Sequence, residues 1–94
     1  MHYDAFRNMN WLPRCDLSKP YTAMTVRIIF SHDKQKDDEV EFHIYLWRAK
    51  QLAELFIIFC EESHYENVVI TDVIIIRVAK SMDALIEMEE NLYI

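Results

Sequence analysis

Glycine is missing from all 94 residues of the sequence. Loops that cradle phosphate groups depend on glycine, because their backbone must turn sharply or approach the phosphate closely. The absence therefore argues strongly against a dinucleotide-binding or P-loop protein. No other feature of the sequence excludes a function class as firmly.

Cysteines and long apolar runs are also scarce. The two cysteines are Cys15 and Cys60, whereas a secreted domain of this size would usually carry a denser disulfide framework. The longest apolar run, from Leu55 to Cys60, is far shorter than the ~18–20 residues that cross a bilayer, and the first residues lack the apolar core of a signal peptide. We therefore expect a cytoplasmic protein with free thiols. Should the chain be encoded by a phage, a possibility taken up below, this compartment would be the cytoplasm of the host.

Apolar residues, by contrast, are abundant, and charge is unevenly distributed. Hydrophobic residues make up 52% of the chain, so a domain this small is expected to hide some apolar surface against a partner or a second copy, and a homodimer is the default expectation. The net charge is −6, with an excess of basic residues in 1–36 and a larger excess of acidic residues in 37–94. This balance disfavours direct binding of nucleic acid or a membrane and favours a basic protein partner.

Hydrophobic periodicity predicts three strands and two helices. Residues 21–31 and the stretch through Val40, Phe42 and Ile44 alternate as strands do, and the polar residues 33–38 between them predict a hairpin loop. Residues 46–62 have helical spacing, 67–78 form a β-branched run, and 82–92 follow a helical pattern again. The prediction is an α+β fold: an antiparallel β-hairpin, a helix, a third strand and a C-terminal helix, with the helices packed on one sheet. Residues 1–20 are predicted as an N-terminal arm of the single domain 21–94.

Three packing predictions accompany these elements. The central helix should bury one apolar stripe, and the third strand should be covered on both faces, because it is almost continuously apolar. Ser81 is predicted to cap the last helix, which should turn one apolar stripe inward. The predicted stripes are Leu46, Ala49, Ala53, Phe56 and Cys60 in the central helix, and Leu85, Met88 and Leu92 in the last one.

The first candidate binding surface lies on the polar arc of the central helix. At about 100° per residue, a tryptophan and an isoleucine fall in the middle of this arc, where a surface helix is expected to be polar. Exposed aromatic anchors are typical of interface centres, so we interpret the stripe as partner-facing. It consists of Trp47, Gln51, Glu54 and Ile58. The alternative is that Tyr3, Phe6 and Trp11 of the arm cover it within the monomer.

The second candidate surface is the acidic side of the last helix. Asp83, Glu87 and Glu90 recur at helical spacing, and no basic residue follows Lys80. Such spaced carboxylates can imitate a phosphate backbone and occupy a nucleic-acid-binding cleft. The commoner meaning of an acidic run is a solvated face.

Catalytic and metal-binding constellations are weak throughout. Cys60 and His64 are four residues apart, but the paired ligands of zinc sites are absent, so Cys60 is predicted as a core thiol and no metal or cofactor is expected. Ser31, His32 and Asp33 are consecutive on a strand, where neighbours point to opposite faces and cannot form a triad. We expect no enzyme.

The sequence as a whole therefore favours a small protein–protein interaction module. Its size and lack of motifs suggest an inhibitor of the kind that phages and mobile elements encode, such as an anti-CRISPR or other anti-defence protein. Such a protein would block its target by binding it. An acidic nucleic-acid mimic is the first alternative, and a small enzyme or metal protein is a disfavoured second.

Overall fold

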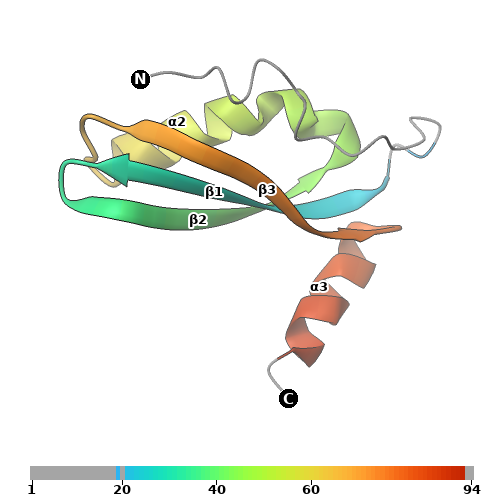
Figure 1. Ribbon diagram of the computed structural model, residues 1–94. Coiled ribbons are helices and arrows are strands. Elements are labelled where there is room, and N and C mark those ends of the chain that lie inside the picture. Colours follow the sequence, from blue (N-terminus) through green and yellow to red (C-terminus); the bar gives the residue numbers. More distant parts are fainter. Residues whose placement is uncertain (1–18, 20, 93–94) are drawn as a thin grey trace.

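The computed structural model describes residue 19 and residues 21–92 as a three-stranded sheet with helical segments on both sides (Figure 1). The elements are β1 (Ala23–His32), β2 (Gln35–Tyr45), the 3₁₀ helix η1 (Leu46–Gln51), α2 (Leu52–Glu62), β3 (Val69–Ala79) and α3 (Met82–Asn91). All strand pairs are antiparallel, in the order β2-β1-β3. The predicted α+β fold is confirmed.

The two α-helices lie on opposite faces of the sheet. In Figure 1, α2 runs along the upper face, while α3 projects from the lower face near one end of the strands. We call these the α2 face and the α3 face. In β1, Met24, Val26, Ile28 and Phe30 belong to the core cluster of the α2 face, whereas Ala23 packs with Leu85 of α3. Alternate residues of β1 therefore face different helices, as the alternation in the sequence predicted for the two faces of this strand.

The main core lies between the sheet and α2. Phe30 is central to it, because its ring contacts Phe56 and Phe59 of α2 edge to face, with centroids 5.1 and 6.2 Å apart. Such pairs add a small gain to the burial of apolar area. Val40, Phe42 and Ile44 of β2 line the same core, as their alternation predicted.

The predicted helix 46–62 is one continuous segment with two geometries. Leu46, Ala49 and Leu52 are buried at a spacing of three residues, which matches the period of a 3₁₀ helix. Leu52, Phe56 and Cys60 then follow at a spacing of four, which is the spacing of an α-helix. The predicted inward stripe is confirmed, but the assumption of a uniform 100° period was wrong for residues 46–51.

Residues other than glycine adopt the left-handed backbone conformation where the chain turns. Asp37 has φ 60°, and in the connection between α2 and β3 His64 has φ 56° and Asn67 has φ 55°. Asp, Asn and His tolerate this region better than other side chains. The hairpin loop is shorter than predicted, because β1 and β2 pair as far as His32 and Gln35.

The third strand is an edge strand, and the exposure of its side chains shows that the prediction of cover on both faces was wrong. Val69 and Val78 are about half exposed, and Ile74 is 37% exposed. No described strand pairs with the outer side of β3. The continuous β-branched run therefore reflects an apolar edge and not a central strand.

The last helix confirms its predicted cap but only part of its inward stripe. The Ser81 hydroxyl accepts a hydrogen bond from the Ala84 amide at 3.1 Å, and Leu85 is fully buried. Met88 and Leu92 are exposed, contrary to the prediction. The residue that reaches the sheet one turn after Leu85 is Glu89. Glu89 takes the inward position because the α3 face offers polar partners for its carboxylate.

Candidate protein-binding surfaces

The structure places all four residues of the first candidate surface on the outside of η1 and α2. Trp47 is 53% exposed and Ile58 is 50% exposed, and Gln51 and Glu54 are exposed too. We call this set the η1–α2 surface. Trp47 lies on η1, whose 3₁₀ geometry departs from the uniform α-helical spacing that grouped it with Ile58 of α2.

Trp47 is held by its immediate neighbours. Its ring stacks on Tyr45 with centroids 6.3 Å apart and an angle of 20° between the planes. The Arg48 guanidinium lies 4.5 Å from the centre of the same indole ring. Stacking and cation–π contact both favour a fixed position of the ring. An exposed tryptophan between a tyrosine and an arginine combines the residue types most enriched at binding hot spots.

The alternative explanation for Trp47 was the N-terminal arm. Tyr3, Phe6 and Trp11 lie outside the described residues, as does Cys15.

All three acidic residues of the second candidate surface are exposed on α3. Asp83, Glu87 and Glu90 point away from the sheet, and among the described residues none of them makes a side-chain hydrogen bond or an ion pair. The neighbouring carboxylate Glu89 is only 18% exposed and faces the sheet. The helix thus separates three outward carboxylates from one inward carboxylate.

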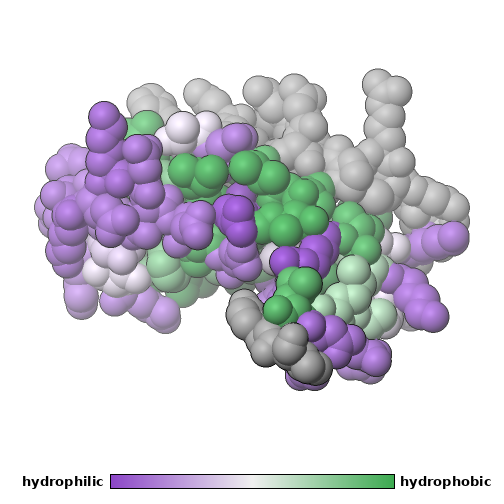
Figure 2. Space-filling model, turned by 60° about the horizontal axis from the view of Figure 1, so that its bottom comes forward, coloured by the Kyte–Doolittle hydropathy of each residue, from purple (hydrophilic) through white to green (hydrophobic). Residues whose placement is uncertain are grey.

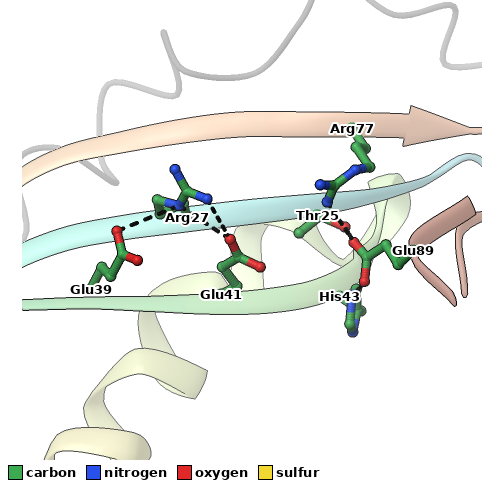
Figure 3. Close-up of polar contacts among 7 residues, drawn as sticks. All are labelled: Thr25, Arg27, Glu39, Glu41, His43, Arg77 and Glu89. Carbon is green, nitrogen blue, oxygen red and sulfur yellow. Dashed lines mark hydrogen bonds and ion pairs between the residues drawn. The ribbon is translucent and has the colours of Figure 1, made fainter. Parts of the chain in front are cut away.

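Glu89 is the centre of a polar cluster on the α3 face, which sequence reasoning missed (Figure 3). Its carboxylate accepts hydrogen bonds from the Thr25 hydroxyl and from Arg77 Nη1, the latter at 3.0 Å, and it contacts His43 Nε2. Thr25 lies between His43 and Arg77 in the sheet, opposite each of them in register. These bonds, led by that from Thr25, hold the pKa of Glu89 below its usual value, although burial opposes the shift. The cluster ties α3 to all three strands.

A second ion pair lies further along the same face (Figure 3). Arg27 of β1 donates to Glu41 at 2.7 Å and lies 3.7 Å from Glu39, so the two glutamates share one face of β2. The hydrogen bond to Glu41 raises the pKa of Arg27 above its usual value. Both glutamates are well exposed, so this arrangement organises the surface and does not form an acid–base pair.

The Ser31 hydroxyl has a partner of its own, whereas His32 and Asp33 lie against each other, with His32 Nδ1 3.6 Å from the Asp33 carboxylate. His32 Nε2 lies 2.9 Å from Asp38, and the imidazole stacks on the Tyr65 ring at 3.8 Å. The Ser31 hydroxyl accepts from the amide of Asp37. The hydrogen bond from His32 holds the pKa of Asp38 below its usual value. The three residues stabilise the hairpin end of the sheet and do not form a relay.

The scattered cysteine and histidine residues do not converge in the described part of the chain. Cys60 is buried in the main core, as predicted, and burial raises the pKa of its thiol. His64 is exposed. Residues 19 and 21–92 contain no cluster of three or more metal-binding side chains, and within the same ranges no helix is long and apolar enough to span a membrane.

Comparison with family models, with curated proteins and with solved structures found no match for the sequence.

The spacing of α3 was the signal that could have identified Glu89. It lies four residues after Leu85 and therefore on the same side of the helix. The prediction favoured Met88 because it is apolar.

Proposed function

We propose that the protein is an interaction module that binds a protein target through the η1–α2 surface. The observation that supports this is the half-exposed Trp47, which is flanked by Tyr45 and Arg48 and lies outside the two described core clusters. Leaving a tryptophan in water forfeits a large apolar burial, which a partner pocket would recover.

The chemistry of the surface defines the partner. Trp47 and Ile58 supply apolar anchors, while Glu54, Glu61 and Glu62 of α2 are exposed carboxylates. We therefore expect an apolar pocket whose rim carries basic side chains. Binding of this kind could block the target, as small phage-encoded anti-defence proteins do, and it requires no catalytic residue.

The test compares target capture by the wild type and by the double variant Trp47→Ala and Ile58→Ala. A target that is captured and then purified should bind the double variant at least about thirtyfold more weakly, because hot-spot truncations cost about 2 kcal/mol or more. Ile86→Ala is the matched control, since Ile86 has similar exposure but lies on α3. Equal affinity for wild type and double variant, with unchanged circular dichroism, would refute the proposed surface.

A second candidate function rests on α3. Three of its carboxylates are exposed at helical spacing while the fourth, Glu89, is bonded to the sheet, so the exposed set is presented on an anchored helix. This arrangement favours an acidic mimic that occupies a nucleic-acid-binding cleft. Changing Asp83→Asn, Glu87→Gln and Glu90→Gln should then abolish binding to the target, and added salt should weaken binding of the wild type. Binding that resists both changes would exclude the mimic.

A further inference from the structure

The two edges of the sheet have different characters. The β2 edge begins with Gln35, Lys36, Asp37, Asp38 and Glu39, and charges of this kind protect an edge from pairing with another chain. The β3 edge, in contrast, is long and contains only two charged residues, Asp72 and Arg77. Figure 2 shows hydrophobic side chains gathered along the middle of the α3 face, beside α3. An apolar edge strand with few charges is the kind that pairs with a further strand.

The pairing of β3 with β1 shows which face each side chain of β3 occupies. Val73 and Ile75 pair with Ile28 and Val26, and Val78 and Ile70 pair with Met24 and Phe30, so these four lie on the α2 face. Val69, Asp72, Ile74, Arg77 and Ala79 pair with residues of the α3 face. The strand keeps this order because two residues, Thr71 and Ile76, have no partner in β1 and form bulges.

These two bulges make β3 complementary to itself in one antiparallel register. If Ile74 lies opposite Ile74 of a second copy, Ile75 lies opposite Val73, both on the α2 face. Ile76 of the first copy is a bulge residue without a partner, so Arg77 comes to lie opposite Asp72 of the second copy. Thr71 of the second copy is likewise skipped, so Val78 of the first copy lies opposite Ile70 of the second. Each pair has both members on one face, as antiparallel pairing requires.

The same register is complementary in charge. It places the only two charged residues of β3 opposite each other twice, Asp72 with Arg77 on both sides of the twofold axis. Arg77 uses Nη1 for Glu89, and Asp72 uses Oδ1 to accept from the Val73 amide, so each side chain has further atoms for a cross-strand pair. A register shifted by one residue would place side chains of opposite faces together.

We propose that a second copy of the chain adds to β3 in this register and forms a continuous six-stranded sheet across a twofold axis at Ile74. Pairing would satisfy the outward amides and carbonyls of β3 and cover the exposed Val69, Ile74 and Val78. The dimer leaves the η1–α2 surface out of the contact, so this inference does not depend on the proposed function.

Cross-linking through one accessible cysteine tests the register. In a background with Cys15→Ser, where the remaining Cys60 is buried, the variant Ile74→Cys should form a covalent dimer with a thiol-bridging reagent that spans about 5 Å, the distance between directly opposed Cβ atoms. Leu55→Cys is the matched control, because Leu55 is 39% exposed against 37% for Ile74 but lies on α2. The control should cross-link at least about tenfold more slowly. Equal rates for the two variants would overturn the proposed register.

Light scattering on the full chain tests the charge pairing. The wild type should have twice the monomer mass, and Asp72→Lys should raise the dissociation constant about tenfold, because like charges then oppose each other at two places. Adding Arg77→Glu to Asp72→Lys should restore the dimer. If circular dichroism shows that this double variant is unfolded, Ile74→Lys, with two like charges at the axis, replaces it and should give monomers. A monomeric wild type, or a dimer that withstands both Asp72→Lys and Ile74→Lys, would refute the proposal.

Discussion

The two faces of the sheet are stabilised by different means. On the α2 face, the packing of Phe30, Phe56 and other apolar side chains forms the main core. On the α3 face, one buried leucine, Leu85, is combined with the polar cluster of Glu89. Hydrophobic burial scales with area and needs no direction, whereas the hydrogen bonds of Glu89 require each partner in place. We therefore expect α2 to determine global stability and α3 to be a separable attachment.

The largest expected effect is the loss of a core side chain on the α2 face. Phe56→Ala should lower the free energy of unfolding by about 3–5 kcal/mol, because it removes apolar burial and leaves a cavity under Phe30. Denaturant unfolding measures the loss. If the variant is largely unfolded, Phe56→Leu provides a milder version of the same change.

Leu85→Ala is the corresponding core substitution on the α3 face. Hydrogen exchange should show that it releases α3 while the amides of β1 keep most of their protection, because Leu85 packs against Ala23 and Ala79 and not in the main core. Equal loss of protection in α3 and β1 would show that the two faces unfold as one unit.

A smaller effect is expected from the polar cluster. Glu89→Gln keeps the size of the side chain but weakens its bonds to Arg77 and His43, so it should lower the free energy of unfolding by about 1–2 kcal/mol. The matched control is Glu87→Gln, an exposed position two residues away, which should change stability by less than about 0.5 kcal/mol. Equal effects of the two substitutions would show that the cluster contributes nothing specific.

Sequence patterns identified the elements and the inward stripe of residues 46–62, because burial imposes a period of two on strands and about four on helices. In the last helix they identified only Leu85 correctly, since Met88 and Leu92 are exposed. The patterns did not distinguish an edge strand from a central one, because an apolar run such as Val73 to Val78 is compatible with either position in a sheet. They also missed Glu89, whose inward position depends on polar partners from three strands far apart in the chain. The exposed candidates Trp47, Ile58, Asp83, Glu87 and Glu90 were identifiable because each breaks or repeats a local pattern, but a local pattern does not specify a partner.

The free energy of unfolding should depend on pH through three carboxylates of the described chain. The pKa values of Glu89, Asp38 and Asp33 are held below their usual values by their hydrogen bonds in the folded chain. A carboxylate with a lowered folded pKa binds protons more readily when unfolded, so its stabilising contribution is complete above about pH 5 and is lost as the pH falls through the folded pKa. Unfolding free energies measured from pH 6 to pH 3 should therefore decline in the acid range, and Glu89→Gln should reduce the slope. If Glu89→Gln has the same acid slope as the wild type, the polar cluster does not hold α3 through a charged Glu89, and Leu85 alone attaches the helix to the sheet.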